Sequence, residues 1–153
     1  MAECDIGGQP DAVARADRIV LPGVGAFKAC VEALEAVPEA WQHYQGHYTR
    51  LNGLHSDVYP GVPEGLAQLS ALGLPLACLT NKPTAFAEQL LERKGLRAHF
   101  QHVFGGDAFA RKKPDPLPLL KTCEALGTSP AHTVMVGDSS NDAQAANAAG
   151  CPI

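Results

Sequence analysis

The stretch Val134-Met135-Val136-Gly137-Asp138-Ser139-Ser140-Asn141-Asp142 decides the fold that this sequence predicts. Its apolar beginning, residues 133–136, has the pattern of a buried strand, and Gly137 interrupts that run. The alanine-rich residues 143–149 that follow favour a helix. A carboxylate between such a strand and such a helix lies at the carboxyl edge of the sheet, where open α/β sheets bind their ligands.

Asp138 and Asp142 support two interpretations, and the sequence leaves both open. Two carboxylates on one short turn suit a hard cation such as Mg²⁺, which is usually held by one or two carboxylates together with water and phosphate oxygens. Aspartate and serine are also preferred at helix N-caps. The same residues are therefore equally typical of the first turn of a helix.

The rest of the chain alternates between helical and extended patterns. Residues 38–50 predict a helix, and from residue 62 onward the order is helix, strand, helix, strand, helix, strand, helix. The expected helices are 62–72, 84–94, 117–126 and 143–149, and the expected strands are 74–79, 102–104 and 133–136. We expect the first of these helices to turn Val62, Leu66, Leu69 and Leu72 inward. This order predicts an α/β fold with a Rossmann-like parallel sheet and flanking helices.

Composition narrows the function classes. The 153 residues contain 46% hydrophobic residues and carry a net charge of −4, which does not suggest a nucleic-acid-binding protein. The five cysteines are an odd number without a C-x-x-C pair, which argues against a zinc site or a disulfide framework. No apolar run reaches about 18 residues, and the N-terminus lacks a signal-peptide pattern. We therefore expect a cytoplasmic protein that binds neither nucleic acid nor membrane.

Two further polar loops follow or connect the predicted strands. Thr80 and Asn81 come directly after strand 74–79, and a hydroxyl with free N–H groups at a helix start forms a phosphate cradle. Lys113 lies in a rigid Lys-Pro-Asp-Pro loop, where its ammonium could neutralise a phosphoryl oxygen. Taken singly, Thr80 could be a helix cap and Lys113 a surface lysine. Their order along the chain favours one shared phosphate site.

These loops resemble motifs two, three and four of the haloacid dehalogenase superfamily. The resemblance covers roughly residues 40–153, and the sequence around Val58-Tyr59-Pro60-Gly61-Val62 is most similar to bacterial phosphoglycolate phosphatases. It implies Mg²⁺-dependent hydrolysis of a small phosphorylated metabolite. The implied catalytic residues are Thr80 and Lys113, the implied phosphate-binding residues are Thr80, Asn81 and Lys113, and the implied metal ligands are Asp138 and Asp142.

The sequence departs from that superfamily at its first motif. The superfamily's first strand ends in Asp-x-Asp-Gly and supplies the aspartate nucleophile and the general acid/base, and no such strand is found here. Residues 8–36 instead resemble the glutamine amidotransferase subunit of imidazole glycerol phosphate synthase, without a counterpart of its nucleophilic cysteine. We expect Ile19-Val20-Leu21 to take the central position of the sheet, between residues 76–79 and 134–136.

The expected organisation is an amidotransferase-like strand-turn-helix over residues 1–37, a helical cap remnant over 38–58, and an incomplete, truncated haloacid dehalogenase core over 59–153. The expected function is that of a phosphoglycolate phosphatase-like enzyme, inactive in this chain because the covalent nucleophile is absent. The alternatives are a non-catalytic phosphate or Mg²⁺ binder, a glutaminase, and a chimeric or truncated product with no selected function.

Overall fold

The computed structural model describes residues 35–153, of which residues 35–51 belong to a first compact unit and residues 52–153 to a second. The described part of the first unit is helix α3 (Pro38–Leu51). Its half-buried aromatic residues contact one another, since Trp41 stacks on Tyr44 at 5.4 Å between ring centroids. The predicted helix at residues 38–50 is thus confirmed. The expectations for residues 8–36 and for Ile19-Val20-Leu21 fall outside the described residues, apart from the last positions of the first range.

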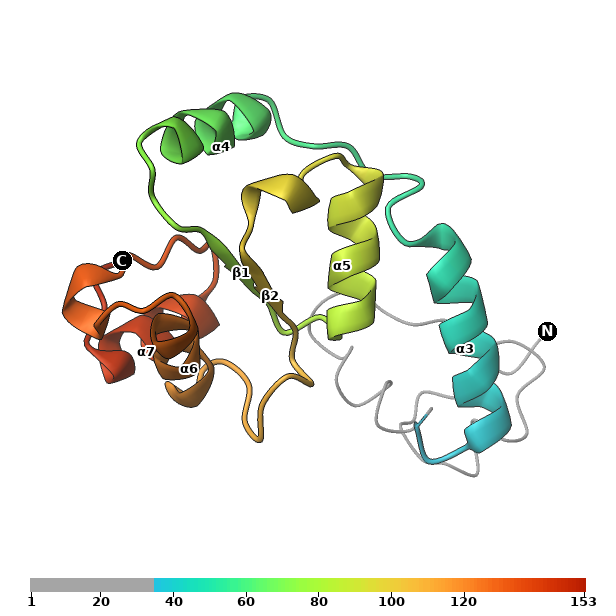
Figure 1. The fold of residues 1–153 in the computed structure, drawn as a ribbon. Helices are drawn as coiled ribbons and strands as arrows, with labels where there is room; N and C mark the ends of the chain where they lie inside the picture. The colour runs from blue at the N-terminus through green and yellow to red at the C-terminus, as the bar shows by residue number, and fades with distance from the viewer. Residues whose placement is uncertain (1–34) are drawn as a thin grey trace. The chain divides into compact units, whose positions relative to one another are not determined.

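The second unit is an α/β arrangement around a short parallel strand pair (Figure 1). Strands β1 (Ala77–Leu79) and β2 (His102–Phe104) pair in register, with Cys78 opposite Val103. The other elements are α4 (Val62–Ala71), α5 (Thr84–Arg93), η1 (Arg97–His99), α6 (Leu117–Ala125), η2 (Pro130–His132) and α7 (Ser140–Ala149). Helix α5 connects the two strands and packs against β2, and α6 packs against both strands. The predicted alternation of helices and parallel strands is confirmed.

The core of this unit lies between α6, α7 and the C-terminal residues. It consists of Leu119, Cys123, Met135, Ala146 and Cys151, all buried. The two cysteines are free thiols. Burial and the neighbouring Cys123 raise the pKa of Cys151 to about 11, which keeps this thiol protonated at neutral pH. Helix α6 is confirmed where the sequence predicted it, and its residues Leu119 and Cys123 are buried in this core.

The predicted strand over residues 133–136 is wrong for the described structure. Only Met135 is buried, and Val134 and Val136 are 65% and 87% exposed. The Met135 N–H donates to the carbonyl of Pro152 at 2.8 Å, and the described residues provide no strand ladder beside it. An apolar run becomes a strand only where a neighbouring strand takes up its backbone groups.

The position of α4 was predicted correctly, but its buried face was not. The helix starts after Gly61, which has a φ of 85°, and none of its residues is buried. Leu69 is 39% exposed, and Leu72, which follows the helix, is 73% exposed. The main neighbour of α4 among the described elements is the single turn η1. Amphipathic spacing identifies a helix, but it does not supply an element to cover the apolar face.

No helix within residues 35–153 is long and apolar enough to cross a membrane.

The contrast between Met135 and Val136 gives a stability prediction. Met135→Ala removes a side chain from the core cluster and should lower the free energy of unfolding by about 2–5 kcal/mol. Val136→Ala removes an exposed side chain and should change it by no more than about 0.5 kcal/mol. Urea denaturation of both variants checks this. A loss for Val136→Ala as large as that for Met135→Ala would show that residue 136 is covered in solution.

Candidate active site

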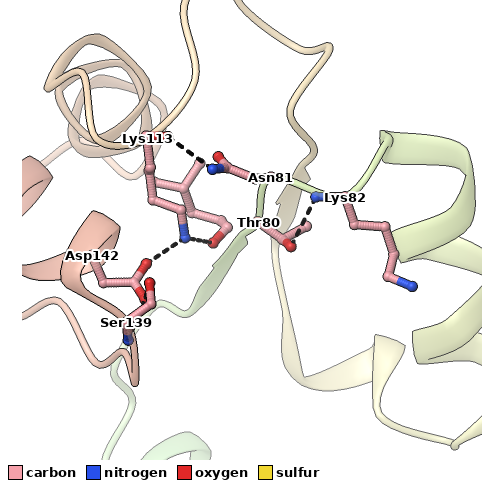
Figure 2. Close-up of polar contacts among 7 residues, drawn as sticks. Thr80, Asn81, Lys82, Lys113, Ser139 and Asp142 are labelled. Atoms are coloured by element: carbon pink, nitrogen blue, oxygen red, sulfur yellow. Dashed lines mark hydrogen bonds and ion pairs between the residues drawn. The ribbon is translucent and has the colours of Figure 1, made fainter. Parts of the chain in front are cut away.

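The turn between β1 and α5 carries the first two predicted site residues. The N–H of Thr80 donates to the carbonyl of Phe104 at 3.0 Å, which continues the pairing of the strands beyond β1. Its hydroxyl accepts the N–H of Lys82 at 3.2 Å and so stabilises the turn (Figure 2). A threonine hydroxyl also has one proton to donate. No described residue accepts that proton, which is therefore available to a ligand oxygen.

Lys113 is the centre of the site and is only 8% exposed. Its ammonium donates to the carbonyl of Leu79 and to Oδ1 of Asp142, each at 2.6 Å (Figure 2). The side-chain amide of Asn81 donates to the backbone carbonyl of Lys113 at 2.8 Å. The lysine loop is thus attached to the end of β1 through both its side chain and its main chain. The interpretation of Lys113 as a surface lysine is wrong.

Asp142 is buried at the start of α7, where it makes two kinds of contact. Its Oδ2 accepts the N–H of Ser139 at 3.1 Å and the hydroxyl of Ser139 at 2.6 Å, as in a capping box. Its Oδ1 accepts the ammonium of Lys113. The helix-cap interpretation is therefore confirmed, and the role of Asp142 as a metal ligand stays a prediction. Burial alone would raise the pKa of Asp142, but the hydrogen bonds from Lys113 and Ser139, with the charge of Lys113, hold it below its usual value.

Gly137 provides the space that Asp142 needs. A Cβ built at residue 137 would lie 2.5 Å from both Cβ and Cγ of Asp142. Any other residue would push this carboxylate away from Ser139 and Lys113. The sequence indicated Gly137 only as the end of a strand, because a contact five residues further along the chain has no signal in composition or periodicity.

Asp138 lies on the same turn but is exposed, and no described residue forms a hydrogen bond or ion pair with its carboxylate. The structure therefore joins Asn81 and Asp142 through Lys113, which forms a hydrogen bond with each of them. Thr80 directly precedes Asn81 in the chain. The structure does not place Asp138 in contact with this group.

The metal-binding capacity of this turn is limited. Within residues 35–153 no group of three or more His, Cys, Asp or Glu side chains gathers to form a closed metal site. Three protein hydrogen bonds already occupy Asp142. The free carboxylate of Asp138 can bind a cation directly. This donor set fits Mg²⁺, which keeps several waters and takes only one or two carboxylates.

Two residues missed by the sequence analysis support the β1–α5 turn. Asp107, in the loop after β2, accepts hydrogen bonds from Thr84 at the start of α5. Asn52 is 5% exposed, and its amide donates to the carbonyl of Phe86 at 2.8 Å and its oxygen accepts Lys82 Nζ at 3.3 Å. All of these contacts join residues more than 20 positions apart, so local sequence patterns cannot reveal them.

Comparisons with known proteins agree with this architecture. The family model described as haloacid dehalogenase-like hydrolase matches residues 8–150. A phosphoglycolate phosphatase from Thiobacillus denitrificans is 48% identical over 115 residues, which cover 75% of this chain and 51% of that protein. One from Chromobacterium violaceum is 50% identical over 110 residues, covering 72% of this chain and 48% of that protein. The chain thus spans about half the length of these relatives.

Solved structures show the same similarity. A predicted phosphoglycolate phosphatase from Haemophilus somnus superimposes with a TM-score of 0.73 and 33% identity, over 81% of this chain and 57% of that one. A haloacid dehalogenase-superfamily hydrolase of subfamily IA from Geobacter sulfurreducens gives a TM-score of 0.67 and 26% identity, over 93% of this chain and 73% of that one.

The buried ion pair predicts an unequal effect of two alanine substitutions. Asp142→Ala leaves the Lys113 ammonium buried without its carboxylate and should lower the free energy of unfolding by about 3–5 kcal/mol. Glu124→Ala breaks the exposed pair of Glu124 with Lys121 and should lower it by no more than about 1 kcal/mol. Denaturant titration of the two variants measures both losses. Equal, small losses would show that the buried pair does not form.

The lowered pKa of Asp142 predicts how stability depends on pH. A carboxylate with a folded-state pKa below its unfolded value of about 3.9 stabilises the fold above that pH. This contribution is lost as the pH falls through the lower folded-state pKa. Thermal midpoints measured between about pH 3 and 7 should therefore fall less steeply at the acidic end in Asp142→Asn than in the wild type. Parallel curves for the two proteins would contradict this assignment.

Proposed function

The chain belongs to the haloacid dehalogenase-like hydrolase family, and we propose that it carries the phosphate-binding part of a phosphoglycolate phosphatase-like, Mg²⁺-dependent enzyme. The proposed substrate is a small phosphorylated metabolite. The observation that carries the proposal is the buried ammonium of Lys113, which donates to the carbonyl of Leu79 and to Asp142 where β1 ends. A fixed ammonium beside a helix start and a threonine hydroxyl has the donors that a phosphoryl group requires.

The residues of the site have different roles in binding the phosphoryl group. The ammonium of Lys113 has three N–H groups, of which Leu79 and Asp142 accept two, so one is left for a phosphoryl oxygen. The hydroxyl of Thr80 offers a second donor. The side chain of Asn81 is already used in holding Lys113, so we assign it a supporting role at the edge of the phosphate.

Local charge supports the need for a divalent cation. Lys113 and Asp142 neutralise one another, and Asp138 adds a negative charge, so these three side chains together form a group with a net negative charge. A phosphate ester dianion would be repelled by it. A bound Mg²⁺ would supply the positive charge that reverses this sign, and Asp138 is the residue with a free carboxylate to hold it.

We propose that this chain does not turn over phosphate esters. Asp142, which lies against Lys113, has its oxygens occupied by three hydrogen bonds and is a poor nucleophile. Among the described residues, no other carboxylate touches the Lys113 ammonium. Without covalent catalysis, the reaction loses the step that divides it into two easier ones.

The finer divisions of the chain are part of the same proposal. Residues 59–153 would be the incomplete core, residues 38–58 a remnant of a helical cap, and residues 1–37 a segment resembling the amidotransferase subunit. The proposal also includes a cytoplasmic location for the protein. The second candidate function is a non-catalytic binder of phosphate and Mg²⁺. It is favoured by a site that has donors and in which no described carboxylate other than Asp142 touches the Lys113 ammonium.

Assay of the purified chain against phosphoglycolate with Mg²⁺ tests the first proposal, and hydrolysis should stay at the background rate.

Calorimetric titration with inorganic phosphate tests the site itself, and binding should require Mg²⁺. Asp138→Asn should abolish most of this Mg²⁺-dependent binding, and it should leave the thermal midpoint unchanged because Asp138 is exposed.

Two results would contradict these proposals. Mg²⁺-dependent hydrolysis that is abolished by Asp138→Asn would mean that another residue supplies the nucleophile. Absence of phosphate binding with Mg²⁺ present would exclude both the phosphatase-like site and the non-catalytic binder, and would leave a product without a selected function.

A further inference from the structure

Helix α5 is capped by a residue from another loop. Its own N-cap position is held by Pro83, which has no side-chain acceptor. Oδ1 of Asp107, 23 residues further along the chain, accepts the N–H of Thr84 at 2.7 Å and the hydroxyl of Thr84 at 2.6 Å. These hydrogen bonds lower the pKa of Asp107 below its usual value. The start of α5 is therefore fixed by the loop that follows β2.

The backbone of that loop lies directly on the β1–α5 turn. A Cβ built at Gly105 would lie 2.2 Å from the nitrogen of Thr84, and one at Gly106 would lie 2.4 Å from the carbonyl oxygen of Asn81. The N–H of Gly106 donates to the carbonyl of Lys82 at 2.9 Å. No side chain fits between the two backbones, which explains the pair of glycines before Asp107.

The other end of the same loop is attached to the same turn. Asn81 donates to the backbone carbonyl of Lys113 at 2.8 Å. The loop of residues 105–113 is thus bound to the turn of residues 80–84 at both of its ends. At the first point Asp107 accepts Thr84 and Gly106 donates to Lys82, and at the second point Asn81 donates to Lys113. A change at the first point alters the turn from which Asn81 reaches the second.

We propose that Asp107 is a positioning residue of the phosphate site. By capping α5 from the loop after β2, it sets the turn that presents Thr80 and that lets Asn81 hold Lys113. Asp107 does not touch the phosphate itself. This inference rests on the proposed phosphate-binding function and assigns Asp107 a role in it.

The exposure of Asp107 makes the proposal testable, because its substitution buries no unpaired group. The variants are Asp107→Ala, which removes the acceptor, and Asp107→Asn, which keeps an oxygen at the same place. The matched control is Glu88→Ala, which breaks the ion pair of Glu88 with Arg97 further along α5. Each variant is titrated calorimetrically with inorganic phosphate and Mg²⁺, well below its thermal midpoint. The side-chain amide resonances of Asn81 are followed by NMR in the same samples.

The expected result is that Asp107→Ala weakens phosphate binding by at least about fivefold, within the usual range of coupling between sites. The Asn81 amide resonances should shift in that variant, whereas Asp107→Asn and Glu88→Ala should stay close to the wild type in both measurements. A purely structural cap would lower the thermal midpoint and leave affinity and these resonances unchanged, and that result would overturn the proposal.

Titrations of the wild type and of Asp107→Ala test the proposed function and the role of Asp107 separately. A wild-type chain that does not bind phosphate with Mg²⁺ overturns the proposed function, and with it the role of Asp107 in phosphate binding. A wild-type chain that binds, with Asp107→Ala binding equally well, overturns only the role of Asp107. If Asp107→Ala does not fold, Thr84→Val, which removes the hydroxyl donor to Asp107, is measured in its place and is expected to weaken binding in the same direction.

Discussion

The buried ammonium of Lys113 is the constraint on which the described α/β unit depends. An ammonium that is 8% exposed has to find acceptors inside the protein. Its acceptors are the last carbonyl of β1 and a carboxylate in the first turn of α7, so the charge ties together three segments that are far apart in the chain. Several local features follow from it. Gly137 leaves room for the carboxylate, and Ser139 occupies its second oxygen.

In this arrangement the stability of the unit depends on polar contacts as well as on apolar packing. Strands β1 and β2 have three residues each, and a two-stranded pair is marginal by itself. The core cluster that supports them is small and contains two thiols and an alanine. Hydrogen bonds between loops therefore hold the carboxyl edge of the sheet, where the site lies, and apolar packing holds the helices behind it. A ligand that binds Lys113 uses its third N–H group and shares the ammonium with the carbonyl of Leu79 and with Asp142.

The sequence predicted what local patterns determine and missed what depends on distant partners. Strand β2 and helices α3, α5 and α6 lie where periodicity and glycine signals placed them, since those signals are written within each segment. The segment 133–136 has the composition of a strand, but Val136 is exposed because no described residue pairs beside it. The site loops were identified by their order along the chain. The double role of Asp142 and the capping of α5 by Asp107 were not, because each depends on a residue brought close only by the fold.

Substitutions of the site residues differ in whether they affect ligand binding alone or also the stability of the fold. Lys113 and Asp142 are buried and contact one another, so any change in either alters the charge of the interior together with the geometry of the site. Asp138 and Asp107 are exposed, and the contacts that they make or offer lie at the surface of the unit. A substitution there removes a carboxylate without leaving a buried charge unpaired. Substitutions of the exposed residues Asp138 and Asp107 can therefore change ligand binding without the destabilisation that a buried unpaired charge causes. Substitutions of the buried pair, Lys113 and Asp142, change both binding and stability.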